Sequence, residues 1–443
     1  MDRDQVDREY VEVYPLRWES ISKETRERIL QTRSIAQLKD ISIYIHIPFC
    51  PVICPFCTFN KRLFNNTLYH KYVDALRQEI LLYKGHPDFA DRKITAIYFG
   101  GGTGSMLTPN DANEILSLIE KNFPVAREAE ITMECYPTTI DYHKLMEYRN
   151  AGINRISIGV QSFSKANLKI IGRGDSYHSN KDVIIAALEA GYGKVGVDLM
   201  YRFPNQTMDD VLQDLETAVG LRPHSISTYS LEISATPMES SQLEFPPDEA
   251  DKEMFHLIGA FLEQQGYRRF AQPDFARPGK ECKYVLNAWR APQQLLLGFG
   301  AGAHSHYFGG HIWANVYSVE KYMDAVNSGC LPSVFGAPVT RRELIHKYMV
   351  LGVRCVEIDK DPFQAMFGTA IEDYFASQIH ALFEKGWLED AGRKYIITKE
   401  GLWYIDNISK TFYSAFNVNE KQPWGKGLHH SFPRARAQGG GEG

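Results

Sequence analysis

From Ile41 onward, short apolar segments alternate with longer stretches in which apolar residues recur at helical spacing. This alternation constrains the fold, because strands separated by helices pair in parallel and the helices cover the sheet. We therefore predict an α/β protein built on a partial, open (β/α)6 TIM-type barrel. The expected strands are Ile41–His46, Ile94–Phe99, Glu130–Glu134, Arg155–Gly159, Lys194–Leu199 and Ser225–Tyr229. The expected helices are Tyr69–Tyr83, Pro109–Lys121, Tyr142–Ala151, Asn180–Ala190 and Met208–Leu221.

The pattern changes after about residue 310. Helical spacing at Leu344–Val353 and Ile371–Lys385 is followed by two short β-type segments on either side of Ala391, which is the order of a winged helix. The tail is rich in glycine and polar residues, a composition expected to stay disordered. We predict an N-terminal arm over 1–40, a barrel over 41–310, a smaller winged-helix-like α+β domain over 311–410 and a disordered tail over 411–443.

Three cysteines follow the first expected strand with the spacing C-x3-C-x2-C: Cys50, Cys54 and Cys57. A 4Fe-4S cluster normally takes four cysteines, so a site that supplies three leaves one iron open to a substrate or cofactor. Structural zinc needs a second pair of Cys or His ligands at short spacing, and the chain has none. A disulfide framework is expected in short secreted chains, not in 443 residues with seven cysteines. The single cysteines are expected to be buried: Cys135, Cys282, Cys330 and Cys355.

Composition excludes several classes of protein. The chain is 44% hydrophobic and 23% charged with a net charge of −5, as expected for a globular protein of two domains. It has no basic block that would bind a phosphate backbone, so we expect no nucleic-acid partner. It has no apolar run long enough for a membrane span and no signal-peptide core, so we expect a cytoplasmic protein with no membrane partner. A reducing compartment also suits an oxygen-sensitive cluster.

Polar and glycine residues follow the ends of successive strands. In a parallel α/β architecture ligands bind at these carboxyl ends. The run Gly100-Gly101-Gly102-Thr103 lets the backbone approach a ligand closely. Four further side chains lie at the same end of the predicted barrel: Glu134, Gln161, Arg173 and Asp198. Acids for an ammonium or ribose and an arginine for a carboxylate suit a zwitterionic ligand such as S-adenosylmethionine (SAM).

Together these motifs resemble one family closely. Tyr-x-His-Ile-Pro-Phe-Cys-x3-Cys-x-Phe-Cys, Gly-Gly-Gly-Thr and Gly-Val-Gln-Ser-Phe are similar to the HemN-like radical SAM enzymes, relatives of oxygen-independent coproporphyrinogen III oxidase, over about residues 40–405. The resemblance implies a 4Fe-4S cluster on the three cysteines and two molecules of SAM. Contacts to the first SAM are implied for Tyr44, Gly101, Glu134 and His304. Contacts to the second are implied for Phe56, Gly102, Thr103, Gln161, Arg173 and Asp198.

Departures from the family pattern guide the choice of reaction. The oxidase pattern is Cys-x3-Cys-x2-Cys-x-Cys, and Phe59 stands here at the position of its fourth cysteine. The HemN-like heme chaperones carry a heme-binding His-Asn-x2-Tyr-Trp, and the aligned stretch Glu281–Arg290 keeps only the Trp of that signature. We therefore expect methyl or methylene transfer from the second SAM to an sp2 carbon of a planar, unsaturated substrate. Coproporphyrinogen decarboxylation, heme-ring opening and a heme chaperone remain alternatives. The expected electron donor is a flavodoxin or ferredoxin.

Overall fold

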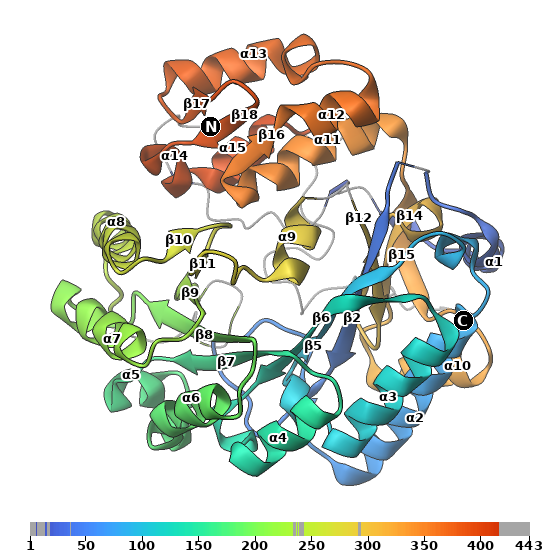
Figure 1. Ribbon diagram of the computed structural model, residues 1–443, viewed down its shortest axis with the longest axis horizontal. Helices are drawn as coiled ribbons and strands as arrows, with labels where there is room; N and C mark the ends of the chain where they lie inside the picture. Colours follow the sequence, from blue (N-terminus) through green and yellow to red (C-terminus); the bar gives the residue numbers. More distant parts are fainter. Residues whose placement is uncertain are drawn as a thin grey trace, which may run out of the picture.

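The computed structural model describes residues 6, 14–15, 18–35, 37–233, 236, 238, 243–290 and 294–415. One large sheet, with strand order β10-β11-β9-β8-β7-β6-β5-β2-β12, forms its centre (Figure 1). Neighbouring strands from β12 to β9 run parallel. The predicted strands are present as β2 Asp40–Ile47, β5 Ile94–Gly101, β6 Val125–Cys135, β7 Arg155–Gln161, β8 Lys194–Tyr201 and β9 Ser225–Ser230.

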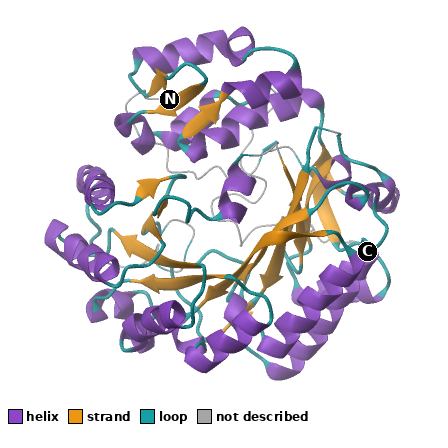
Figure 2. Ribbon diagram, viewed as in Figure 1, coloured by secondary structure: helices purple, strands orange, loops and turns teal. Residues whose placement is uncertain are grey.

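Helices cover the outer face of this sheet (Figure 2). The strands are buried on both faces, as in β7, because the helices lie outside and side chains fill the lumen. The predicted helices are present as α2 Asn66–Leu82, α3 Pro109–Asn122, α4 Tyr142–Asn150, α6 Ser179–Glu189 and α7 Met208–Gly220, joined by α5 Lys165–Ile170 and α8 Asp248–Gln264. The α/β prediction is confirmed. No helix within the described ranges is long and apolar enough to cross a membrane.

The sheet extends beyond the six expected strands at both edges. β12 (Gln294–Phe299) pairs in parallel with β2, and β11 (Asp274–Ala276) pairs antiparallel with β9 and with β10 (Arg268–Arg269). Helix α9 (Lys283–Trp289) packs against β2, β5 and β12 and lies between the two edges in Figure 1. The barrel is therefore open between its edge strands β10 and β12, and α9 occupies the opening.

A second sheet follows β12, with order β1-β15-β14-β13. Its strands are β1 Glu19–Ser20, β13 His304–His306, β14 His311–Asn315 and β15 Ser333–Pro338; helix α1 (Lys23–Gln31) follows β1, and helix α10 (Val319–Asn327) lies between β14 and β15 in the chain. β1 brings the N-terminal arm onto β15. Because β13 pairs with β14, the predicted boundary at residue 310 runs between two paired strands.

The C-terminal part is a smaller α+β unit, as predicted. It contains a three-stranded sheet of order β16-β18-β17. Its elements are α11 Arg341–Gly352, β16 Glu357–Asp359, α12 Lys360–Phe367, α13 Ile371–Glu384, β17 Leu388–Asp390, β18 Lys394–Ile397, α14 Lys399–Trp403 and α15 Ile405–Thr411. Of the tail predicted from residue 411, residues 416–443 lie outside the described part.

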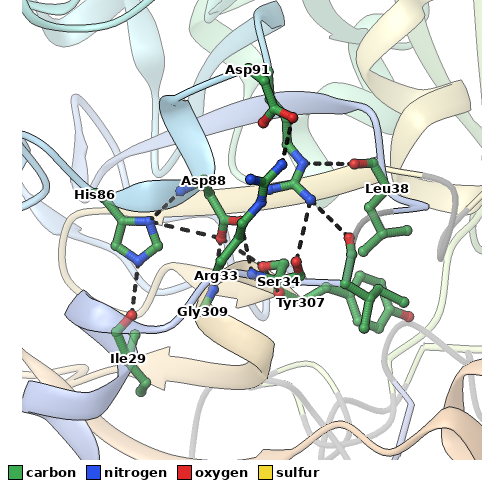
Figure 3. Close-up of polar contacts among 11 residues, drawn as sticks. Ile29, Arg33, Ser34, Leu38, His86, Asp88, Asp91, Tyr307 and Gly309 are labelled. Atoms are coloured by element: carbon green, nitrogen blue, oxygen red, sulfur yellow. Dashed lines mark hydrogen bonds and ion pairs between the residues drawn. The ribbon is translucent and has the colours of Figure 1, made fainter.

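A buried ion pair fixes the segment that precedes β2 (Figure 3). Asp88 is fully buried and accepts hydrogen bonds from the N–H and the hydroxyl of Ser34 at 2.8 and 2.6 Å, and from the N–H of Gly309 at 3.1 Å. Arg92 pairs with Asp88 and donates from Nε to the Leu38 carbonyl at 2.6 Å. This cluster joins the N-terminal arm, the loop before β5 and the turn after β13.

Candidate functional site

The cysteine loop follows β2 at the carboxyl end of the sheet. Short strands β3 (Phe49–Cys50) and β4 (Arg62–Leu63) pair in parallel and tie the ends of the loop together. The N–H of Phe64 donates to the carbonyl of Cys50 at 2.9 Å, and that of Cys57 to the carbonyl of Cys54 at 3.2 Å. These bonds hold the three cysteines within one closed loop.

The three thiols of the loop can serve as ligands of an iron-sulfur cluster. All three cysteines are unpaired thiols; Cys50 and Cys54 are buried and Cys57 is partly exposed. Burial raises the pKa of Cys50 to about 11 and also raises the pKa of Cys57, so bound iron must displace thiol protons. In the described part of the chain, no three His, Cys, Asp or Glu side chains converge on one metal position. A cluster, in which each thiolate binds a different iron, fits this spacing.

The glycine run at the end of β5 lies against the cysteine loop and leaves no room for side chains. A Cβ on Gly102 would stand 3.0 Å from Cys50 Sγ. A Cβ on Gly101, where φ is +112°, would stand 2.7 Å from the ring of His46. The Thr103 hydroxyl donates to Cys50 Sγ at 3.6 Å. Glycine is therefore required sterically where the backbone of β5 borders the cysteines.

Two predicted carboxyls lie near the strand ends beside this loop. Burial and the neighbouring Asp198 raise the pKa of Glu134 to about 8. Burial and the neighbouring Asp274 raise the pKa of Asp198 to about 7. Neither side chain is fully covered. Carboxyls held in this way gain from a ligand that supplies hydroxyl or ammonium donors, because such donors favour the ionised form.

Gln161 and Arg173 meet at Gly159. Gln161 has a left-handed backbone with φ of +70°, and its Nε2 lies 2.9 Å from where a Cβ of Gly159 would stand. Arg173 donates from Nη1 to the Gly159 carbonyl at 2.8 Å and from Nε to Cys54 Sγ at 3.1 Å. The sequence predicts Arg173 as a carboxylate ligand, and its contact with a cysteine sulfur is an addition from the structure.

Phe56, the remaining residue of the expected second SAM site, packs into a separate apolar cluster. Its partners in this cluster include Leu168 and Ile171 near α5 and Phe203 after β8. The cysteine loop is thereby attached to the same part of the barrel that carries Arg173.

A chain of hydrogen bonds orients Tyr44. Tyr44 and His46 share one face of β2, and the Tyr44 hydroxyl lies 3.2 Å from His46 Nδ1. His46 Nε2 lies 2.8 Å from the Asn60 carbonyl, which only accepts, so Nε2 carries the proton and Nδ1 accepts from Tyr44. Burial lowers the pKa of His46 to about 4, which keeps the ring neutral. His46 and Asn60 are absent from the predicted site, although alternation along β2 places His46 beside Tyr44.

His304 lies at the start of β13 and is joined to the cysteine loop through one residue. Its Nε2 is 3.3 Å from the Tyr317 hydroxyl, and the Asn60 side chain donates to the Tyr317 carbonyl at 3.0 Å. The edge of Trp18 packs against the His304 ring, with centroids 5.8 Å apart. Burial lowers the pKa of His304 to about 4, so the imidazole is neutral and able to bind a metal.

Glu79 is a positioning residue that the sequence did not predict. It is fully buried in α2 and accepts hydrogen bonds from the Gly300 N–H, the Asn315 amide and the Tyr322 hydroxyl, each at 2.7 Å. Burial raises the pKa of Glu79 to about 7. The next residue of the turn, Ala301, accepts from the Asn60 side chain at 3.0 Å, so Glu79 fixes the turn that supports the cysteine loop.

Three tyrosines form an aromatic cluster beside Glu134. The rings of Tyr98 and Tyr284 are 4.8 Å apart, and Tyr44 lies 6.2 and 6.1 Å from them, with planes inclined by 22 to 33°. A Cβ on Gly100 would meet Tyr98, Tyr44 and Glu134 within 3.2 Å. The rings are partly exposed, and one pair, Tyr44 and Tyr98, is stacked while the other two are tilted, an aromatic surface that suits a planar ligand.

Comparisons with known proteins identify the family of the chain. The family model of the Radical SAM superfamily matches residues 44–218, and that of the HemN C-terminal domain matches residues 339–404. Heme chaperone HemW of Bacillus subtilis (strain 168) is 32% identical over 81% of this chain and 96% of its own length. Oxygen-independent coproporphyrinogen III oxidase of Escherichia coli (strain K12) is 28% identical over 90% of this chain and 91% of its own length.

The solved structure of coproporphyrinogen III oxidase (HemN) from Escherichia coli, described as a radical SAM enzyme, superposes with a TM-score of 0.76 and 26% identity. The superposition covers 88% of this chain and 93% of that one. A parallel barrel with three cysteines after its first long strand defines the class of radical SAM proteins, whose cofactors are a 4Fe-4S cluster and SAM. The chain belongs to the HemN-like group of this class, as its sequence motifs predicted.

Proposed function

We propose that this chain cleaves SAM at a 4Fe-4S cluster held by its three cysteines and binds a tetrapyrrole, with heme as the first candidate. One observation carries the choice of ligand: a heme chaperone and a coproporphyrinogen oxidase each match this chain over more than nine-tenths of their own length. Both names refer to tetrapyrroles. These two relatives support tetrapyrrole binding, one of the alternatives from the sequence, better than they support the expected methyl transfer.

The residues at the carboxyl ends of the barrel strands, here called the barrel mouth, have separable tasks in this proposal. When bound, the cluster supplies one electron to the sulfonium of SAM, yielding methionine and a 5′-deoxyadenosyl radical. Gly101 and Gly102 keep the backbone close to the cysteines. Glu134 and Asp198 accept hydrogen bonds from the ribose or ammonium group. The electron comes from a one-electron donor of the flavodoxin or ferredoxin type.

The aromatic cluster and His304 support a planar, iron-containing ligand. Counting back from Trp289, the position of the histidine in the chaperone signature is Tyr284 here. Burial raises the pKa of Tyr284, so its phenol keeps its proton and is a poor iron ligand. His304, neutral and only partly covered, is the better candidate for binding heme iron.

Heme binding is tested directly by spectroscopy. Hemin is titrated anaerobically into the purified chain, and the Soret band is followed for wild type, His304→Ala and Tyr284→Phe. We expect a saturable band with one heme per chain, a tenfold or larger loss of affinity in His304→Ala and little change in Tyr284→Phe. His143→Ala on α4, where the side chain is 84% exposed, is the control. An absorbance that rises without saturation, identically in all variants, would exclude the heme site.

Methyl transfer stays a second candidate because one observation favours it. The side chains expected to hold a second SAM, Gln161 and Arg173, come together at Gly159 next to Cys54. Reduced protein supplied with methyl-deuterated SAM is expected, under this reading, to form S-adenosylhomocysteine and deuterated deoxyadenosine. Unlabelled deoxyadenosine without S-adenosylhomocysteine would exclude it.

A further inference from the structure

The guanidinium of Arg173 lies directly against a sulfur of the cysteine loop. Its Nε is 3.1 Å from Cys54 Sγ, and its Nη1 donates to the Gly159 carbonyl at 2.8 Å. The group stacks over the ring of Tyr136, with Cζ 4.3 Å from the centroid. Two hydrogen bonds and a stacked ring therefore fix both the position and the plane of the cation.

The backbone of the turn that carries Arg173 lies against the cysteine loop. Gly172 has a φ of +71°, and a Cβ there would stand 3.2 Å from Pro55 Cδ. The Arg173 N–H donates to the Leu168 carbonyl at 2.7 Å, which closes the end of α5. The Tyr136 hydroxyl donates to Asp175 at 2.9 Å, which holds the stacking ring in place. The approach of Arg173 to Cys54 is thus a feature of the backbone as well as of the side chain.

The other two sulfurs have different surroundings. Cys50 Sγ accepts from the neutral hydroxyl of Thr103 at the longer distance of 3.6 Å. Lys61 is also near the loop, but its ammonium donates to the backbone carbonyls of Cys57 and Phe59 at 2.6 and 3.4 Å. Within the residues that the structure describes, Arg173 is the cation whose N–H is directed at a sulfur of the loop.

We propose that Arg173 is a positioning residue that raises the reduction potential of the cluster through a charged N–H···S bond to Cys54. The inference rests on the cluster site of the proposed function. Reduction adds one electron from the flavodoxin- or ferredoxin-type donor and makes the cluster more negative by one charge. A fixed cation at a ligand sulfur stabilises the reduced form more than the oxidised form, and hydrogen bonds to sulfur are an established determinant of cluster potential.

This task is separable from contact with a second SAM. Arginine has five N–H donors in a planar fork, and the contacts to Cys54 and Gly159 use one on Nε and one on Nη1. The outer edge of the fork can still bind a carboxylate. A potential measured without SAM therefore contains no contribution from a carboxylate bound to Arg173.

The test uses the full chain, reconstituted anaerobically with iron and sulfide, as wild type, Arg173→Lys and Arg173→Met. Iron content is measured first, and the midpoint potential is then obtained without SAM from the EPR signal of the reduced cluster. We expect Arg173→Met to lower the reduction equilibrium tenfold or more, which is 59 mV for one electron. The midpoint potential of Arg173→Lys is expected to lie between those of wild type and Arg173→Met, because lysine keeps the charge but lacks the planar fork.

Lys169→Met is the matched control, because it removes an exposed charge from the same helix, α5. Its potential is expected to equal that of wild type. A fully loaded Arg173→Met with the wild-type potential would overturn this inference and leave the cluster site intact. If Arg173→Met does not retain iron, Arg173→Lys decides: a lowered potential supports the inference, while an unchanged potential or loss of iron overturns it. A wild-type chain that takes up no iron overturns the proposed cluster site and this inference together.

Discussion

At the residue scale, the barrel mouth holds carboxyls in surroundings that disfavour their charge. Glu134 and Asp198 are close enough to repel each other, and the desolvation of both groups acts in the same direction. A bound ligand can offset the free-energy cost of ionising such desolvated carboxyls, because its hydrogen-bond donors stabilise the ionised form. Glu134 also borders Gly100 and the aromatic cluster, so its protonation state bears on ligand binding.

SAM binding is therefore expected to depend on pH through Glu134. The pKa of Glu134 is raised to about 8, so below pH 8 the carboxyl must lose a proton before it accepts hydrogen bonds from the ligand. The affinity should rise by up to about tenfold per pH unit as the pH increases toward 8 and level off above it. Calorimetry of SAM with the oxidised, reconstituted protein between pH 6.5 and 9 measures this.

Glu134→Gln is expected to bind SAM about tenfold more weakly at pH 8.5, since a charged hydrogen bond contributes about 1.5 kcal/mol or more. It is also expected to lose the rise in affinity above pH 7, the range in which Asp198 is already mostly ionised. Glu128→Gln, an exposed position on the same strand β6, is expected to behave as wild type. Equal pH profiles for wild type and Glu134→Gln would contradict the assignment of Glu134.

At the element scale, the N-terminal arm is fastened to the barrel by a buried ion pair. Asp88 and Arg92 are 0% and 2% exposed, and their remaining hydrogen bonds go to Ser34, Leu38 and Gly309 among others. Removing one partner of such a pair leaves an uncompensated charge in the interior, which costs much more than an exposed pair contributes.

We expect Asp88→Ala to lower the free energy of unfolding by about 3–5 kcal/mol, because Arg92 stays buried without its carboxylate. Urea denaturation followed by circular dichroism measures the change. Asp91→Ala is the control: Asp91 is three residues away, pairs with Arg33 at the surface and is 59% exposed. Its loss should cost less than about 1 kcal/mol. A similar decrease in the free energy of unfolding for Asp88→Ala and Asp91→Ala would refute the importance assigned to the buried pair.

The same scale shows what the sequence can and cannot predict. The six central strands were predictable because each is a short segment with apolar or β-branched residues between amphipathic helices. β12 is equally apolar, but its pairing with β2 joins distant parts of the chain and follows no local βα pattern. The pairing of β2 with β5 brings the glycine run to the cysteines. The Glu79–Gly300 bond and the Arg173–Cys54 bond join residues 221 and 119 positions apart, and no local pattern indicates such contacts.

At the scale of the whole molecule, the C-terminal unit contacts the second sheet through a buried lysine. Lys347 in α11 is 0% exposed, and its Nζ lies 3.3 Å from His306 Nδ1 in β13 and 4.1 Å from the Tyr307 ring centroid. Burial lowers the pKa of Lys347 well below its ordinary value. The folded chain therefore holds a neutral amine at pH values where the unfolded chain holds an ammonium.

This difference predicts how stability changes with pH. Unfolded lysine binds a proton below about pH 10.4, while the folded amine binds one only below its lowered pKa. The unfolded state takes up more protons in this window, so wild-type stability falls with decreasing pH by up to about 1.4 kcal/mol per unit from this group. Lys347→Met removes the effect, and its free energy of unfolding relative to wild type should rise as the pH falls from 9.5 to 7.5.

Urea denaturation of both proteins at pH 9.5, 8.5 and 7.5 measures that rise. Lys399→Met in α14, where the lysine is 82% exposed, serves as the control and should show no trend with pH. The difference between Lys347→Met and wild type cancels the other groups that titrate in this range, because they are common to both chains. A difference that stays constant from pH 9.5 to 7.5 would mean that Lys347 keeps its proton in the folded chain. The contact of α11 with β13 would then hold a buried cation instead of a neutral amine.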